Sequence, residues 1–294
     1  MPDSPGLISI ASEGLGAEID PQGAQLFALR DAEGRDLLWD GDPAIWNGRA
    51  PVLFPIVGSL ANGRYRVDGA TFDLPRHGFA RNSRFEVAES TTSSARFRLR
   101  ADEKTLAIYP FRFELEIGFA LAGATLTVTG AVRNPGDRLL PASLGFHPAF
   151  RWPLPYGQAR AAYGLQFDRD EPAPIRRLSA QGLVEAATRP TPVAGRELTL
   201  RDDLFEADAV IFDALASRSV RYGAPEGPHL RIDFPDTPYL GVWTKPGAPF
   251  ICVEPWHGIA DPEGFQGDFR DKPGVFEVAP GEAREVTFSV SLRP

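Results

Sequence analysis

Apolar and polar residues alternate with a period of two along much of the chain, which is the spacing of a half-buried β-strand. The alternation is longest over residues 111–121, where phenylalanine, leucine and isoleucine share one parity. Shorter stretches at 126–128 and 230–234 repeat it. No long segment shows the apolar spacing of an amphipathic helix, and one short helical turn is expected near 202–205. The pattern predicts an all-β fold with few short helices.

Turn-forming residues are frequent and spread along the chain, with 29 glycines and 28 prolines in 294 residues, as expected for many short strands. Residues 276–278 and 286–292 alternate around the turn Ala279-Pro280-Gly281-Glu282, which predicts a closing β-hairpin. Residues 158–196 are mixed in polarity and are either a linker or a long excursion between strands. No shift in composition marks a boundary, so we expect a single domain over residues 1–294, a large, mostly antiparallel β-sandwich.

Charge and composition exclude several classes of protein. Lysine and arginine number 31 against 39 aspartates and glutamates, a formal net charge of −8, whereas binders of nucleic acid or acidic membranes normally carry a basic surface. Cys252 is the single cysteine, so an intrachain disulfide and a zinc site built from several cysteines are excluded. The first residues do not resemble a signal peptide, and the apolar stretch 117–132 is short and interrupted by alternating threonines. We expect a cytoplasmic monomer or homodimer with no nucleic-acid or membrane partner.

The histidines are the first candidates for chemistry. Three of the four have glycine and aromatic neighbours, and they are His77, His147 and His257. His229 has no such setting. Alternation places His147 on the strand face opposite its apolar neighbours, together with Ser143 and Gly145, and these small residues leave room for a ligand. Pro148 holds His147 extended at a strand end. A histidine bonded to a backbone carbonyl is the alternative.

Glu254 ends the apolar run 249–253, which has the character of a buried strand. A carboxylate there is costly unless it is paired, hydrogen-bonded or placed at the rim of a cleft. Trp256 has the same parity as Glu254. The residues alone leave two interpretations, a catalytic carboxylate or one that caps a loop or pairs with an arginine.

A buried carboxylate, histidines and aromatic rings together suggest sugar chemistry. Ring faces stack on the C–H surface of a pyranose, and charged groups bind its hydroxyls. The carboxylate and a histidine also suit a general acid–base pair. The histidines lack the close spacing of a metal motif, so we expect no metal and no cofactor, with three histidines and Glu254 gathered by the fold as the alternative.

Arg49, Arg64, Arg76 and Arg81 surround the first histidine motif. They either hold hydroxyls or a sugar phosphate, or they pair with surface carboxylates. Asp208 precedes an apolar run, which is more typical of the solvated start of a strand than of a ligand.

Four stretches of the sequence resemble the aldose 1-epimerase (galactose mutarotase) family, in the family's order and over most of the chain. They are Pro51-Val52-Leu53-Phe54-Pro55-Ile56-Val57-Gly58, His77-Gly78-Phe79-Ala80-Arg81, Leu144-Gly145-Phe146-His147-Pro148-Ala149-Phe150, and Trp243-Thr244-Lys245-Pro246-Gly247 leading to Cys252-Val253-Glu254-Pro255-Trp256. The resemblance is nearest to a bacterial branch of uncertain sugar specificity, related to the hexose-6-phosphate 1-epimerases.

This resemblance implies a β-supersandwich with a sugar cleft on a concave sheet, no cofactor, and interconversion of the α and β anomers of a hexose or hexose phosphate. It implies that Glu254 is the general base at the anomeric hydroxyl, that His147 is the general acid at the ring oxygen, and that His77 assists there or binds substrate. The implied substrate-binding residues are Arg81, Asp208, Arg49, Trp243 and Trp256. Opposite charges stabilise each other, so we expect an ionised Glu254 beside a protonated His147.

Two other functions remain open from the residues. A non-catalytic carbohydrate-binding protein would need neither Glu254 nor His147 in ionised form. A glycoside-cleaving sandwich enzyme would normally need two suitably spaced carboxylates, and Glu254 is the one strong candidate.

Overall fold

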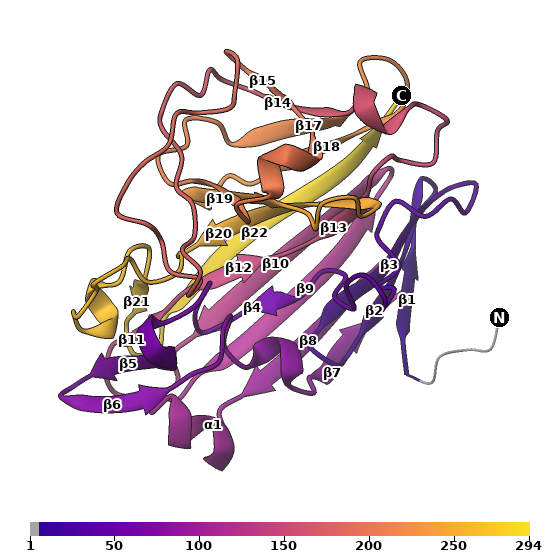
Figure 1. Cartoon of the computed structure of the whole chain (residues 1–294). Coiled ribbons are helices and arrows are strands. Elements are labelled where there is room, and N and C mark those ends of the chain that lie inside the picture. Colours follow the sequence, from indigo (N-terminus) through magenta and orange to yellow (C-terminus); the bar gives the residue numbers. More distant parts are fainter. Residues whose placement is uncertain (1–5) are drawn as a thin grey trace.

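A computed structural model describes residues 6–294 of the chain. Two β-sheets lie one over the other, and smaller sheets flank them (Figure 1). The strands in both large sheets pair antiparallel. The all-β sandwich predicted from the alternation is therefore confirmed.

The larger sheet has nine strands. In spatial order they are β15 (Glu197–Thr199), β14 (Gly164–Phe167), β17 (Ser219–Gly223), β18 (His229–Asp233), β22 (Ala283–Arg293), β10 (Thr125–Arg133), β9 (Glu114–Ala122), β8 (Ser94–Arg100) and β7 (Glu86–Ser90). Strands β9 and β10 alternate strictly between buried and more exposed positions. The period-two pattern thus marks a sheet with one face in the core.

The second sheet has six strands and carries the candidate chemistry. Its strands are β16 (Val210–Phe212), β19 (Tyr239–Trp243), β20 (Phe250–His257), β12 (Leu144–Phe146) and β4 (Val52–Leu53), with β13 (Ala149–Arg151) also paired to β20. Strand β20 lies in the middle of this sheet and is buried along seven of its eight residues. Both of its faces are covered, which explains its nearly continuous apolar sequence.

The two large sheets pack face to face through a shared hydrophobic core. Phe146 of β12 meets Phe288 of β22 with ring centroids 4.8 Å apart. Gly130 of β10 lets the layers approach, because a Cβ atom there would lie 2.6 Å from Leu144. The outward face of the six-stranded sheet is left for the site described below.

The remaining strands form small sheets. They are β1 (Ile8–Ala11), β2 (Leu15–Asp20) and β3 (Gln25–Asp31) in one sheet, β5 (Arg64–Val67) with β6 (Ala70–Asp73), and β11 (Leu140–Ala142) with β21 (Phe276–Val278). The predicted helical turn is present as a 3₁₀ turn over Asp202–Phe205. The other 3₁₀ turns are Ala61–Gly63, Ala80–Asn82, Arg160–Ala162 and Phe269–Asp271.

The sequence did not predict helix α1 (Glu103–Ile108), whose six residues are too few to display a helical period. Its start is fixed by Asp102, which accepts a hydrogen bond from the Thr105 N–H. No helix within residues 6–294 has the length and apolar character needed to cross a membrane.

The predicted closing hairpin is wrong. A turn does form at Ala279–Glu282, but β21 pairs with β11 whereas β22 pairs with β10 and β18. Strand β22 lies between β18 and β10 in the nine-stranded sheet, and it alternates because one face of that sheet is in the core. Residues 158–196 contain β14, and the segment after it loops across to bond with β16 through Arg176 and Ile211. That stretch is an excursion between strands.

Candidate active site

Strand β20 forms the floor of the site, because alternate residues point away from the core. Ile251 and Val253 pack into the core between the sheets. Phe250, Cys252 and Glu254 take the opposite parity, and Phe250 and Cys252 join a separate cluster on the outward face. A carboxylate thus emerges from a strand that is buried along seven of its eight residues.

A cavity of about 280 Å³ opens over this floor. It gathers seven of the eight site residues predicted from the sequence, and they are His77, His147, Glu254, Arg81, Asp208, Trp243 and Trp256. They come from segments far apart in the chain that meet at β20, β19 and the ends of β12 and β16. Size and lining suit one small polar ligand with apolar faces.

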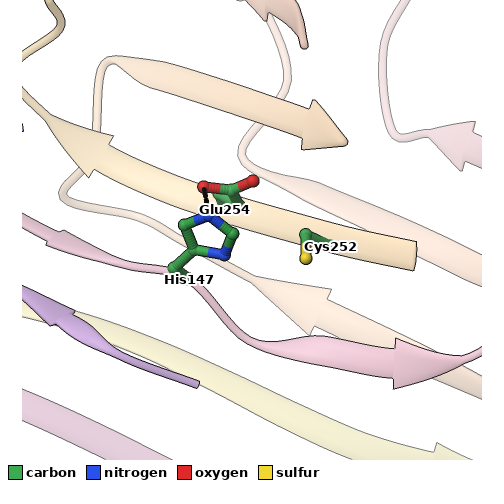
Figure 2. Close-up of side chains that lie close together, drawn as sticks. All are labelled: His147, Cys252 and Glu254. Atoms are coloured by element: carbon green, nitrogen blue, oxygen red, sulfur yellow. Dashed lines mark ion pairs between the residues drawn. The ribbon is translucent and has the colours of Figure 1, made fainter. Parts of the chain in front are cut away.

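His147 and Glu254 both line this cavity, and their side chains face each other (Figure 2). His147 Nε2 lies 3.1 Å from Glu254 Oε2, and the two side chains are 12% and 1% exposed. These two atoms are close but do not form a hydrogen bond, and Glu254 Oε2 has no hydrogen-bond partner within residues 6–294. The other ring nitrogen of His147, Nδ1, is also buried without a partner in that part of the chain. The pair therefore keeps bonding capacity for a ligand.

Burial sets the charges of this pair. It lowers the pKa of His147 to about 3, and it raises the pKa of Glu254 well above its ordinary value, although the positive charge of Arg76 opposes that rise. Burial thus disfavours the expected combination of an ionised Glu254 and a protonated His147, because desolvation raises the free energy of each charged form.

Two tryptophans enclose the His147 ring. Trp46 stacks on it with centroids 5.3 Å apart and planes 28° apart, and Trp243 meets it edge-on at 6.0 Å. These rings fix the imidazole plane and exclude water from it, which accounts for its low pKa. Trp46 was not predicted, since nothing in its local sequence distinguishes it from a core tryptophan.

His77 is held by the backbone. Gly58 N–H donates to His77 Nδ1 at 3.1 Å, and burial lowers the His77 pKa well below its ordinary value. The Arg76 Nε–H faces the other ring nitrogen, Nε2, so N–H groups on both sides orient the neutral ring. Both His77 and Gly78 have left-handed backbones, and a Cβ atom at Gly78 would lie 2.2 Å from the Phe54 carbonyl oxygen. This strained turn positions the His77 ring in the wall of the cavity.

Two arginines on the cavity wall lack a carboxylate partner in the described part of the chain. Neither Arg76 nor Arg81 forms an ion pair within residues 6–294, whereas the neighbouring Arg64 pairs with Asp73. Arg76 Nε–H donates a hydrogen bond to His77 Nε2 at 3.2 Å. Burial and the charge of Arg76 lower the pKa of Arg81.

Asp208 and Trp256 complete the polar lining. Asp208 has a left-handed backbone with φ of 60°, and its side chain accepts a hydrogen bond from the Ala209 N–H at 2.7 Å. Asp208 therefore lines the cavity, although its place in the sequence was more typical of the solvated start of a strand. The Trp256 indole N–H is buried without a partner within the described residues. Both groups are available to hydroxyls.

Arg49 is the predicted residue that the structure does not bring to the cavity lining. Its guanidinium donates to the Phe27 carbonyl at 2.9 Å and lies over the Phe27 ring at 3.8 Å. The prediction that Arg49 binds substrate is therefore not supported by this geometry. His257 is also outside the lining, with Nδ1 2.9 Å from the Gly274 carbonyl oxygen.

The space beside Gly145 belongs to the protein and not to a ligand. A Cβ atom at Gly145 would lie 2.8 Å from Trp256, and one at Gly241 would lie 2.4 Å from the same ring. The small residue predicted to make room for a ligand instead makes room for the indole. The parity argument for His147 itself holds, since Phe146 points into the core.

Comparison with known proteins now places the chain. A family model described as aldose 1-epimerase matches residues 6–268. The chain belongs to the aldose 1-epimerase family. It is also 34% identical over 296 residues to the chromosomal protein LacX of Lactococcus lactis subsp. lactis, covering 97% of this chain and 99% of that relative.

Solved structures of family members have the same fold. A galactose mutarotase related enzyme from Lactobacillus acidophilus superposes with a TM-score of 0.90 at 30% identity, covering 98% of this chain and 97% of that one. A galactose mutarotase-like protein from Lactobacillus casei gives 0.90 at 29% identity, covering 98% of this chain and 100% of that one. The resemblance predicted from four sequence motifs is confirmed, and this epimerase-family protein is an isomerase.

Proposed function

We propose that the protein is an aldose 1-epimerase that interconverts the α and β anomers of a hexose or hexose phosphate, with Glu254 and His147 as its acid–base pair. One observation carries the proposal: a buried carboxylate and an imidazole stand 3.1 Å apart in a cavity of sugar size, each with bonding capacity to spare. Such a pair moves protons without a metal or redox cofactor.

Ring opening needs one proton removed and one delivered. Glu254 takes the proton of the anomeric hydroxyl, the C1–O5 bond breaks as the carbonyl forms, and His147 gives its proton to O5. After rotation about the C1–C2 bond, O5 attacks the carbonyl carbon from the other face. His147 then recovers its proton from O5 and Glu254 returns one to the former carbonyl oxygen. The enzyme ends as it began, and the product is the other anomer.

Burial favours one direction of this exchange. Opening converts an ionised Glu254 and a protonated His147 into the neutral pair, and burial disfavours both charges. The reactive ion pair must therefore form when sugar hydroxyls enter and hydrogen-bond to the carboxylate, aided by the positive charge of Arg76. His77 lies beside the pair, with its ring centroid 6.0 Å from that of His147, and contacts the substrate from the side of the cavity.

The two arginines without ion-pair partners bear on the choice of sugar. Arg76 and Arg81 offer several donors to hydroxyl or phosphate oxygens. With a net charge of −8, long-range attraction for an anion is poor, so a sugar phosphate would depend on these local groups. A free hexose and a hexose phosphate therefore both fit the proposed site.

Anomer exchange measured by NMR across a panel of free and phosphorylated aldoses tests the proposal. We expect the purified protein to accelerate exchange of at least one of them above the buffer rate. Saturable sugar binding without any acceleration would contradict it and would favour a carbohydrate-binding protein of the same fold.

A further inference from the structure

Cys252 lies beside the proposed acid–base pair and takes no part in the proposed reaction. It is fully buried and stands two residues before Glu254 on β20, so the thiol and the carboxylate project from the same face of the strand. Figure 2 shows both on that strand, with the imidazole of His147 next to them. Three different ligand-type side chains thus share one small space.

The distances among these groups suit a metal ion. One ligand atom from each of His147, Cys252 and Glu254 lies within 4.8 Å of the other two. Three points no farther apart than this have a common position within about 2.8 Å of each, and zinc bonds to nitrogen, oxygen and sulfur are about 2.0–2.3 Å long. Small changes in side-chain torsions close that difference.

The chemistry of the group agrees with the distances. Glu254 Oε2 and His147 Nδ1 are buried without hydrogen-bond partners within residues 6–294, and Glu254 is 1% exposed. A nitrogen, a sulfur and a carboxylate oxygen form a donor set for Zn²⁺, and three protein ligands leave a fourth position toward the cavity. We propose that His147, Cys252 and Glu254 bind a soft divalent cation such as Zn²⁺ and that its occupation switches the acid–base pair off.

The cation would inhibit the enzyme because it binds the lone pairs of Glu254 and His147 that the acid–base reaction needs. A metal-bound Glu254 oxygen cannot accept the anomeric proton, and a metal-bound His147 nitrogen cannot deliver one to the ring oxygen. Coordination releases the protons of the Cys252 thiol and of the Glu254 carboxyl to solvent, and no electron is transferred. The inhibitory half of this proposal rests on the proposed function, whereas the binding half does not.

Titration of the metal-free protein with Co²⁺ tests binding directly, because a cobalt–thiolate bond gives a charge-transfer absorption band. The chain has a single cysteine, so this band reports Cys252 alone. We expect one equivalent of Co²⁺ to produce it, Zn²⁺ to displace it, and the Cys252→Ser and Cys252→Ala variants to lack it. His257→Asn lies outside the cavity and should keep it. Absence of the band in the wild-type protein, or equal Zn²⁺ affinity in Cys252→Ser, would overturn the proposal.

Anomer exchange provides the second readout. We expect Zn²⁺ to inhibit the wild-type enzyme and a chelator to restore the full rate, while Cys252→Ser needs more than about tenfold more Zn²⁺ for equal inhibition. Chelation of the purified enzyme should not lower its rate. Inhibition of equal strength in both proteins would contradict the switch. A Co²⁺ band in a protein inactive on every sugar would refute the proposed function and leave the metal site standing.

Discussion

Glu254 on β20 and His147 beyond the end of β12 bring their side chains to within 3.1 Å of each other, in a place where Glu254 is 1% exposed. Neighbouring strands achieve this, because Gly145 and Trp256 are paired across the same two strands. Burial lowers the pKa of His147 to about 3 and raises that of Glu254, so the arrangement favours the neutral form of each group.

Glu254→Gln should stabilise the fold at neutral and alkaline pH. Burial raises the pKa of Glu254, so its contribution to stability is fully present below its unfolded pKa and is lost as pH rises toward the folded pKa. The loss amounts to about 1.4 kcal/mol for each pH unit over that interval, and glutamine avoids it. Thermal unfolding at pH 5 and pH 8 should show a gain in Tm that grows with pH. The exposed Glu226→Gln is the matched control, and a gain that did not vary with pH would contradict a raised Glu254 pKa.

Substitutions of the three motif histidines should affect kcat and KM to different degrees. We expect His147→Asn to lower kcat by about 10²–10⁴-fold, as loss of a general acid does, and His77→Asn to act mainly on KM, because His77 lines the cavity but is not part of the His147–Glu254 pair. His257→Asn should leave both constants nearly unchanged. Steady-state kinetics on each folded variant checks this order. A larger loss of kcat in His77→Asn than in His147→Asn would reverse the assignment of the acid.

Trp46 should control the proton affinity of His147. Removing the stacked ring in Trp46→Ala admits water to the imidazole, so the His147 pKa should rise from about 3 toward its ordinary value of 6.5. NMR titration of the His147 ring protons measures this directly. Phe250→Leu, which also removes a ring that stacks on Trp46, tests whether any aromatic loss has the same effect. An unchanged His147 pKa in Trp46→Ala would refute this role.

The arginines should discriminate by substrate charge. We expect Arg81→Gln to lower kcat/KM for glucose 6-phosphate more than for glucose, and rising salt to lower the first selectively. Arg64→Gln is the control, because Arg64 is already paired with Asp73. Equal effects of Arg81→Gln on both sugars, insensitive to salt, would mean that Arg81 binds a hydroxyl common to both.

Local sequence patterns predicted the parts of the fold that depend on local order. Alternation in residues 111–121 requires one buried face, and β9 has it. The continuous apolar run before Glu254 requires burial on both faces, and β20 has that too. The closing hairpin failed because strand pairing is a non-local choice: β21 is adjacent to β22 in sequence but pairs with β11.

The site residues also divide into those with a local sequence signal and those without one. His147 and Glu254 were identifiable from parity and an interrupted apolar run, which are properties of a single strand. The position of Trp46, and the lack of an ion pair at Arg76 within residues 6–294, depend on which segments meet in space. Arg49 was predicted to bind substrate but lies over the Phe27 ring, and nothing in its local sequence indicates that contact. The charge state of the pair also depended on burial, which the residue types alone could not reveal.

The most direct test of the central claim is the anomer-exchange rate of Glu254→Gln on the best sugar of the panel. Glutamine keeps the shape of the side chain but cannot accept the anomeric proton. The account predicts a loss of about 10²–10⁴-fold in kcat, with circular dichroism and thermal unfolding showing an intact fold. A folded Glu254→Gln variant that exchanges anomers at nearly the wild-type rate would contradict it.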